Sequence, residues 1–423
     1  MALQLLALAL AVVAPAGAYQ VRKVGGRPAG AQLPLPGHPW PHARGPIPGQ
    51  YGASGVAAPP RDLSAALAWS YHHPGGQYHS VVAGGPVIDR ELNLYIVMSD
   101  GVRKLSSEGQ ELWHYVPPGG VINNEACLHG NAVLGSSETG HAFALDAATG
   151  KALWERQLAA NAGADCGYPA AHDGVFVVGS EEGRDLRSIG GNQRVFGLDA
   201  GSGQTLWEFR PEAVVWNLTP LFPGDGTTVF MDFTGGVYRL GLHNGTLLWH
   251  AHAPLSDLSF SDGGASLSPD GSVYTCSNYG NSTGAKGTQG VVRAFSLAQG
   301  QLLWERILQQ PCNSYPAVGS LDGGSALSVV ITPGPFFGNT DLHGSIEAFD
   351  AATGETQWQF QAPPFTGTLL MARGDIRGLG ERLLANPAHP LCAPAHWSAP
   401  TISSDGSVFV GRLDGLLYAV RGP

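Results

Sequence analysis

The sequence predicts an all-β protein folded as a seven-bladed β-propeller. A motif ending in tryptophan recurs along the chain, Asp-Gly pairs recur between its copies, and the two ends of the repeat region are incomplete in complementary ways. The tryptophans are 41 to 55 residues apart, which is close to the period of four-stranded propeller blades. The 60 glycines, spread through 423 residues, favour many tight turns between short strands.

The repeated motif is an apolar strand, a turn ending in glycine, and a second strand that carries tryptophan. Clear copies are Ala-Leu-Asp-Ala-Ala-Thr-Gly-Lys-Ala-Leu-Trp at 144–154 and Ala-Phe-Asp-Ala-Ala-Thr-Gly-Glu-Thr-Gln-Trp at 348–358. The Asp and Thr side chains can bond local amides, and glycine supplies the positive φ of the turn. We interpret the tryptophans as packing between adjacent blades rather than as substrate platforms. They are Trp69, Trp113, Trp154, Trp207, Trp249, Trp304 and Trp358.

Asp-Gly pairs mark the other turn of each blade. They lie between two apolar strands at 173–174, 225–226, 270–271, 322–323 and 405–406. Asp-Gly is a strong signal for a two-residue hairpin. Each predicted blade is therefore strand A, an Asp-Gly turn, strand B, a variable loop, strand C, a glycine turn, and strand D with its tryptophan.

The two ends of the repeat region predict how the ring closes. Residues 398–420 supply strands A, B and C and then the chain stops, while residues 67–72 resemble a lone strand D around Trp69. We predict that this N-terminal strand completes the last blade, because closure removes exposed sheet edges. The stretch 365–396 leaves an eighth blade as the alternative, although no complete blade is visible there.

The N-terminal region predicts a secreted protein. Residues 1–18 combine a short apolar run with Ala16-x-Ala18, as in a cleaved signal peptide, with an uncleaved anchor as the alternative. Residues 19–61 are rich in Pro and Gly and predict a flexible or extended lead-in, and residues 62–423 form the propeller. We expect a secreted or secretory-pathway location, or the periplasm in a bacterium, and no membrane span.

The charge excludes one class of partner. The net charge is −10, only 13% of the residues are charged, and no run of Lys and Arg exceeds two. A nucleic-acid partner is therefore not expected.

The Ala-x-Asp-Ala-x-Thr-Gly-x-x-x-Trp copies resemble the pyrroloquinoline quinone (PQQ) repeat of the quinoprotein alcohol dehydrogenases. This repeat also occurs in outer-membrane assembly lipoproteins and in other non-catalytic propellers, so the resemblance implies the fold more strongly than an activity. The catalytic members hold PQQ on Ca²⁺ at the propeller centre, above a pair of adjacent cysteines. No two of the five cysteines here are adjacent. We expect a binding scaffold without a cofactor, and the alternative is a divergent PQQ- and Ca²⁺-dependent dehydrogenase.

Polar residues precede the predicted A strands and would ring the central channel on one face. They are His79, Asn124, Glu125, Cys166, Asn217, Asp262, Asn313 and His396. Glu125, Asn217 and Asp262 are the candidates for holding a cofactor or Ca²⁺ in the dehydrogenase alternative. Strand ends also need polar caps, and this is the competing interpretation.

Long connections on that same face are the second candidate region. They contain Arg184 and Arg187, then residues 277–290, then Phe336, Phe337 and His343, and finally residues 363–396. Long loops on one face of a rigid scaffold often bind partners, here a protein, a peptide or a glycan. The competing interpretation is solvated insertions.

The cysteines and the glycosylation sequons add expectations for an oxidising compartment. Cys312 with Cys392 and Cys127 with Cys166 are the candidate disulfides, and Cys276 is expected to be a buried free thiol. Asn244 and Asn281 lie in sequons where a glycan could be attached, whereas Asn217 enters an inner strand and should stay bare.

Overall fold

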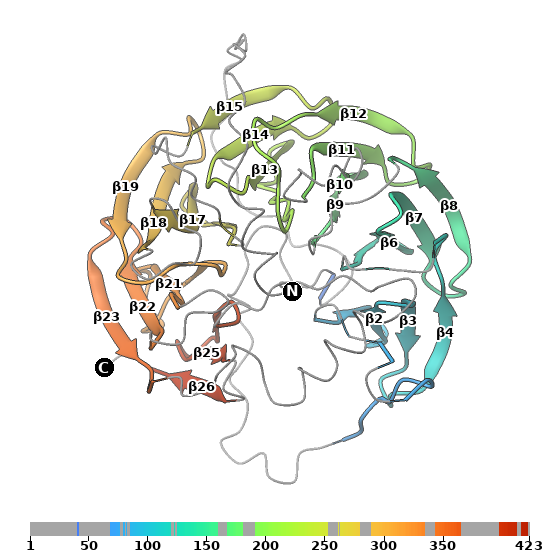
Figure 1. Cartoon of the computed structure of the whole chain (residues 1–423), viewed down its shortest axis with the longest axis horizontal. Coiled ribbons are helices and arrows are strands. Elements are labelled where there is room, and N and C mark those ends of the chain that lie inside the picture. The colour runs from blue at the N-terminus through green and yellow to red at the C-terminus, as the bar shows by residue number, and fades with distance from the viewer. Residues whose placement is uncertain are drawn as a thin grey trace, which may run out of the picture.

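The protein is an all-β propeller in which radial sheets form a ring (Figure 1). The structure is a computed structural model that describes residues 40–41, 68–76, 79–80, 82, 85–119, 122, 125–159, 167–180, 191–252, 261, 263–279, 289–334, 343–364, 397–412 and 416–421. These residues form seven antiparallel sheets, five with four strands and two with three. None of these residues forms a helix able to cross a membrane.

The first three sheets each have four strands. The first contains β1 (Val87–Ile88), β2 (Leu94–Met98), β3 (Gly101–Leu105) and β4 (Glu111–Tyr115). The second contains β5 (Cys127–His129), β6 (Ala132–Ser136), β7 (His141–Asp146) and β8 (Ala152–Gln157). The third contains β9 (Ala170–His172), β10 (Val175–Ser180), β11 (Arg194–Asp199) and β12 (Thr205–Phe209).

The remaining four sheets follow in chain order. The fourth contains β13 (Thr227–Met231), β14 (Val237–Gly241) and β15 (Leu247–Ala251), with a single bridge from Leu221 to Val229 in place of an innermost strand. The fifth contains β16 (Ala265–Leu267), β17 (Ser272–Tyr279), β18 (Gln289–Ser296) and β19 (Leu302–Ile307). The sixth contains β20 (Ala317–Gly319), β21 (Ser328–Ile331), β22 (Ser345–Asp350) and β23 (Thr356–Gln361). The seventh contains β24 (Thr401–Ile402), β25 (Val408–Gly411) and β26 (Leu417–Val420).

The glycine turn before the tryptophan is confirmed, and the Asp-Gly pair at 173–174 forms the predicted two-residue hairpin. The Asp-Gly pairs at 225–226, 270–271, 322–323 and 405–406 instead lie in longer connections between paired residues. At the first turn of the third sheet, Asp173 and Gly174 have φ values of 46° and 76°, which is the pattern of a two-residue hairpin turn. At the second turn of the second sheet, Asp146 Oδ1 accepts hydrogen bonds from the Thr149 N–H at 2.8 Å and the Thr149 hydroxyl at 2.7 Å. The sequence of these turns therefore fixes their backbone locally.

Each outer-strand tryptophan joins its sheet to the next one, as predicted. Trp207 of β12 donates from Nε1 to the Leu242 carbonyl at 2.6 Å, in the turn after β14 of the fourth sheet. A Cβ on Gly245 of that turn would lie 2.8 Å from the Trp207 side chain, so glycine is required both for this contact and for its φ of 63°. Trp113, Trp154, Trp249 and Trp304 make the same kind of bond to Ala147, Ala200, Leu297 and Ala351.

The N-terminal end of the ring repeats part of this pattern. Trp69 donates to the Ser107 carbonyl at 2.9 Å and lies against Gly109 in the turn of the first sheet, which is where an outer-strand tryptophan of a preceding sheet would lie. Residues 68–71 are not in a strand, and β26 pairs only with β25 among the described strands. Closure of the last sheet by the N-terminal strand stays a prediction.

The hydrophobic core is divided among the seams between neighbouring sheets. One cluster combines Val177 and Trp207 of the third sheet with Phe230 and Leu240 of the fourth. Another combines Cys276 and Trp304 of the fifth sheet with Val329 of the sixth. Burial of apolar surface therefore holds each sheet against its neighbours and sets the positions of the connecting loops.

Two described residues of the N-terminal lead-in, Trp40 and Pro41, form backbone hydrogen bonds with the sheets. Trp40 bridges Ile88 of β1, with N···O distances of 3.4 and 2.7 Å, and the Pro41 carbonyl accepts from the Leu128 N–H at 2.7 Å. This part of the lead-in therefore contacts the inner strands of the first two sheets.

Candidate functional site

The long connections leave the sheets on one face of the ring. In an antiparallel four-stranded sheet, the loop between the second and third strands and the connection to the next sheet lie on the same face. Long stretches of this kind separate β10 from β11, β17 from β18, and β21 from β22. We call this the loop-rich face, and the opposite side the turn face. Arg184, Arg187, Asn281, Phe336 and Phe337 belong to these stretches and lie outside the described residues.

Four of the predicted channel residues lie in the described part of the chain. The inner segment of a sheet is the stretch immediately before its first strand. His79 is exposed before the first sheet, Glu125 is buried before the second, Asn217 is half-buried before the fourth, and Asn313 is buried before the sixth. Asn124, Cys166, Asp262 and His396 lie outside the described residues.

Tyr315 connects inner segments across the ring. From the sixth sheet, its hydroxyl donates to the Asn217 carbonyl of the fourth sheet at 2.9 Å and lies 2.7 Å from the Thr219 hydroxyl. Its ring contacts Tyr168 of the third sheet edge-on, at a centroid distance of 6.0 Å. The ring also lies so close to Gly264 of the fifth sheet that a Cβ there would be 1.8 Å from it. One buried tyrosine thus contacts the inner segments of three other sheets.

Other polar groups of the inner segments also link neighbouring sheets. The Glu125 N–H donates to the Gly167 carbonyl at 2.9 Å, and the Tyr168 N–H donates to the Leu218 carbonyl at 2.8 Å. Asn278, at the end of β17, donates to Asn313 Oδ1 at 2.9 Å and accepts from the Cys312 N–H at 2.8 Å. These contacts agree with the second interpretation of the channel residues, in which polar groups at strand ends form hydrogen bonds with the backbone and join neighbouring sheets.

One contact among the described inner segments does not fit a PQQ cofactor. The resemblance would place this group at the propeller centre, with Glu125, Asn217 and Asp262 as its holders. Instead, the Tyr315 ring fills the space beside Gly264, and its hydroxyl joins the fourth and sixth sheets. A planar cofactor bound beside Gly264 would have to displace this buried side chain.

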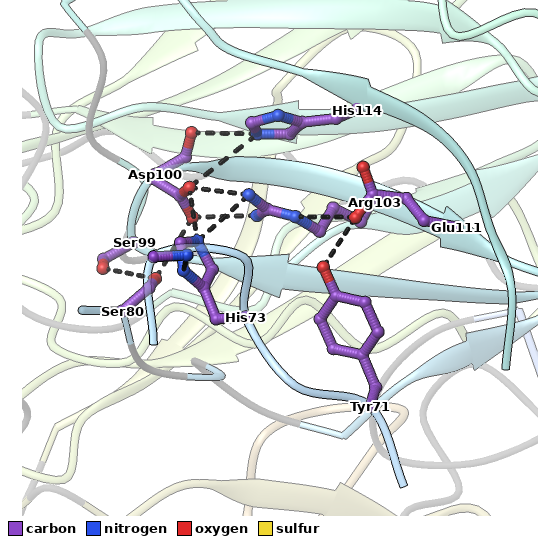
Figure 2. Close-up of polar contacts among 9 residues, drawn as sticks. Tyr71, His73, Ser80, Ser99, Asp100, Arg103, Glu111 and His114 are labelled. Atoms are coloured by element: carbon purple, nitrogen blue, oxygen red, sulfur yellow. Dashed lines mark hydrogen bonds and ion pairs between the residues drawn. The ribbon is translucent and has the colours of Figure 1, made fainter. Parts of the chain in front are cut away.

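Among the described residues of the loop-rich face, an extensive polar cluster surrounds Asp100, in the loop between β2 and β3 (Figure 2). Arg103 of β3 donates to both Asp100 oxygens, at 2.8 and 2.7 Å. His73 Nε2 lies 2.9 Å from Asp100 Oδ2, and the Ser80 hydroxyl donates to Oδ1 at 3.1 Å. The cluster therefore ties the segment that enters the first sheet to that sheet's own loop.

A second carboxylate extends the Asp100 cluster toward the outer strand. Glu111 of β4 lies 3.4 Å from Arg103 Nε and accepts from the Tyr71 hydroxyl at 2.6 Å, as Figure 2 shows. Burial, followed by the hydrogen bond to Glu111, raises the pKa of Tyr71 to about 12. Tyr71 therefore stays protonated near neutral pH and acts as a hydrogen-bond donor.

The Asp100 cluster holds the entering segment against the first sheet, and it is not arranged for proton transfer. Partial burial alone would raise the pKa of Asp100, but the hydrogen bonds from Arg103 and His73 outweigh it and hold this pKa well below its usual range. A general base needs a pKa near the working pH and a free lone pair facing the substrate. Both oxygens of Asp100 are instead engaged in contacts with Arg103, His73 and Ser80.

Sequence reasoning missed Tyr315, Asp100 and Arg103. Tyr315 is separated from Asn217 by 98 residues, and the distance between them depends on how the ring closes. The Asp-x-x-Arg spacing at 100–103 gives a local signal, because it joins a loop to the strand that follows. The other partner, His73, comes from a segment that precedes β1. Its contact with Asp100 therefore depends on the topology of the fold and cannot be predicted from a local pattern.

The disulfide predictions are corrected. Cys276 of β17 and Cys312 of the next inner segment form a disulfide, with their Cα atoms 5.6 Å apart. Cys276 is therefore not a free thiol, and the pairing of Cys312 with Cys392 is wrong, because the second strand of one sheet lies beside the inner segment of the next. Cys127 is free and buried, so its pairing with Cys166 is also wrong, and burial raises its pKa to about 12.

Two other predicted residues can be located. Asn244 is exposed in the turn after β14, where its Oδ1 accepts from the Thr246 N–H at 3.0 Å, and glycosylation there stays a prediction. His343 lies just before β22 on the loop-rich face, and its carbonyl accepts from Arg412 at 2.6 Å. This bond ties the end of one long loop to the seventh sheet.

Comparison with known proteins identifies relatives of these repeats. The family model described as outer membrane protein assembly factor BamB matches residues 98–317, just over half of the chain. The chain is similar to BamB of Burkholderia pseudomallei, with 26% identity over 285 residues that cover 59% of this chain and 68% of that protein. BamB of Moranella endobia is 22% identical over 269 residues, covering 62% of this chain and 64% of the relative.

A kinase and a solved structure also match part of this chain. The serine/threonine-protein kinase AfsK of Streptomyces coelicolor is 26% identical over 251 residues, which cover 59% of this chain and 27% of the kinase. This chain thus spans about a quarter of the kinase's length. The crystal structure of BamB from Moraxella catarrhalis matches with a TM-score of 0.54 and 18% identity, covering 81% of this chain and 86% of that one. The structural match shows a common fold.

Proposed function

Because the chain belongs to the family of the outer membrane protein assembly factor BamB, we propose that it is a non-catalytic propeller that binds another protein through its loop-rich face. The observation that carries this proposal is the contrast between the two candidate regions. The described inner segments are joined to one another through Tyr315 and its neighbours, whereas the long connections all leave the sheets on one face. Binding loops on a rigid scaffold are a common arrangement for recognition.

The chemistry of the described clusters supports binding rather than catalysis. Asp100 is saturated by hydrogen bonds and held far from a useful pKa, and Cys127 is a buried thiol with a raised pKa. Nucleophilic cysteines need the opposite setting, with a lowered pKa and access to solvent. The relatives named as assembly factors give a reason to choose a protein as the partner.

We also propose that the protein works outside the cytosol. The apolar N-terminal run with Ala16-x-Ala18 fits a secretory signal. The disulfide between Cys276 and Cys312 fits an oxidising compartment, where such bonds form and persist.

Site-specific photo-crosslinking tests the proposed binding face. A photo-crosslinking amino acid is placed at His79 or Pro364 on the loop-rich face, and at Glu91 or Asn244 on the turn face, all of which are exposed. In cells that produce the protein, we expect adducts of one defined mass from the first two positions, suppressed by an excess of the unsubstituted chain. The two turn-face positions serve as matched controls and should give no such adduct. Equal adducts from both faces, or none from the loop-rich face, would reject the proposal.

A further inference from the structure

Three possible metal ligands meet at the outer rim of the loop-rich face. Glu212 lies in the connection from β12 of the third sheet to the fourth sheet, His250 is in β15, and His252 comes just after the end of β15. Residues two apart along a strand project to the same side. The His-x-His pair therefore presents two imidazoles toward the connection that carries Glu212.

The distances among these side chains are those of a nearly formed site. Glu212 Oε1 lies 3.7 Å from His250 Nδ1, and Glu212 Oε2 lies 3.3 Å from His252 Nδ1. The two imidazole centroids are 3.9 Å apart, and one ligand atom from each of the three residues falls within 4.8 Å of the others. Ligand atoms about 2.1 Å from a tetrahedral Zn²⁺ are roughly 3.4 Å from each other, so small side-chain movements would complete the geometry.

Tyr238 of β14 positions two of these ligands together. Its ring stacks on the His250 imidazole, with a centroid distance of 3.9 Å and an interplanar angle of 12°. Its hydroxyl accepts from the Glu212 backbone N–H at 3.0 Å and donates to Asp232 Oδ2 at 3.0 Å. Groups behind the ligands that fix their orientation are typical of metal sites.

The nitrogen of His250 that faces the cluster, and that would bind a metal, is Nδ1, which lies 3.7 Å from Glu212 Oε1. The His250 side chain is 9% exposed, and Nε2 is buried with no hydrogen-bond partner among the described residues. The His252 and Glu212 side chains are 66% and 41% exposed, so an ion bound here would have solvent on its outer side.

In other sheets, the residue that corresponds to His250 has a different kind of partner. The residue after the tryptophan is Glu305 in the fifth sheet, where it pairs with Arg293 at 2.6 Å, and Gln359 in the sixth, where it bonds Glu347 at 2.9 Å. Those side chains are matched across neighbouring strands within one sheet. In the fourth sheet, His250 faces a neutral tyrosine on its own sheet and a carboxylate from the preceding connection.

We propose that Glu212, His250 and His252 bind Zn²⁺ with an open fourth position that faces solvent. Two imidazoles and one carboxylate are a ligand set that suits Zn²⁺, and three protein ligands leave a position for water or a ligand from another molecule. The bound ion links the connection between the third and fourth sheets to the outer strand of the fourth, at the rim of the loop-rich face.

Calorimetric titration of the chelator-treated full chain with ZnCl₂ tests this site. We expect saturable binding that His252→Ala and Glu212→Gln each weaken by about tenfold or more. His243→Ala is the matched control, because His243 is an exposed imidazole paired with Asp173 at 3.0 Å on the turn face, and it should leave the affinity unchanged. Thermal unfolding without Zn²⁺ should be the same for the wild type and His252→Ala, since this side chain is exposed.

Two results would overturn the proposal. One is the absence of saturable Zn²⁺ binding by the wild-type chain. The other is an affinity that is unchanged in both His252→Ala and Glu212→Gln, which would place the ion elsewhere. Titration with Co²⁺ gives an independent readout, because a tetrahedral site with nitrogen ligands produces visible absorption bands that should be lost in His252→Ala.

Discussion

Replacing Trp207 with alanine is expected to lower the free energy of unfolding by about 3–5 kcal/mol, the usual cost of removing a large buried aromatic side chain. Trp207 is 6% exposed and packs between the third and fourth sheets, in contact with the turn that contains Gly245. The substitution also leaves the Leu242 carbonyl without its 2.6 Å hydrogen bond from Nε1. Urea denaturation measures the change.

The neighbouring residue provides the control for this prediction. Leu206 is on the same strand, is 44% exposed, and should cost about 0.5 kcal/mol or less when changed to alanine. Trp207→Phe keeps an aromatic ring and gives a folded comparison if Trp207→Ala does not fold. A cost for Trp207→Ala no larger than that for Leu206→Ala would show that the tryptophans do not hold the sheets together.

Arg103→Met should cost about 3 kcal/mol of stability. Arg103 is 2% exposed and neutralises Asp100, so its loss leaves a partly buried carboxylate without its main partner. Because the pKa of Asp100 is lowered in the folded state, its contribution is present above the unfolded pKa near 4 and is lost as the pH falls. We therefore expect the difference between wild type and Arg103→Met to shrink as the pH falls below about 4, measured by denaturation at several pH values.

An exposed pair of the same type is the control for Arg103. Arg421 pairs with Asp405, the two side chains are 57% and 40% exposed, and Arg421→Met should destabilise the protein much less than Arg103→Met does, because solvent screens exposed ion pairs. Adding Asp100→Asn to Arg103→Met should recover part of the lost stability, because the unpaired charge is removed. Equal losses in the free energy of unfolding for Arg103→Met and Arg421→Met would contradict the role of the Asp100 cluster in holding these segments together.

The parts of the fold that could be predicted are those encoded within about twelve neighbouring residues. The Asp-x-x-Thr-Gly turn and its tryptophan reappear in the structure, because hydrogen bonds such as that from Thr149 to Asp146 are local. The repeated spacing then orders the sheets around the ring. The meeting of Cys276 with Cys312 was mispredicted, because it depends on how far one inner segment reaches along the neighbouring sheet.

The candidate sites were predicted less well than the fold. Topology alone indicated the loop-rich face and the residues before the first strands. The partners of Asn217 and Asn313, and the His73 partner of Asp100, come from other sheets or from distant segments, and no local pattern identifies them. The grouping of Glu212 with His250 and His252 likewise joins a connection to a strand that is more than 35 residues away.

The central claim is that this propeller acts by binding and not through a central cofactor. Thermal unfolding of the purified chain, with and without PQQ and Ca²⁺ together, tests it most directly. A cofactor present at a hundred times its Kd stabilises a protein by about 2.7 kcal/mol. We predict no change in Tm, because Tyr315 fills the space beside Gly264. An increase in Tm that requires both PQQ and Ca²⁺ would contradict the claim and favour a dehydrogenase.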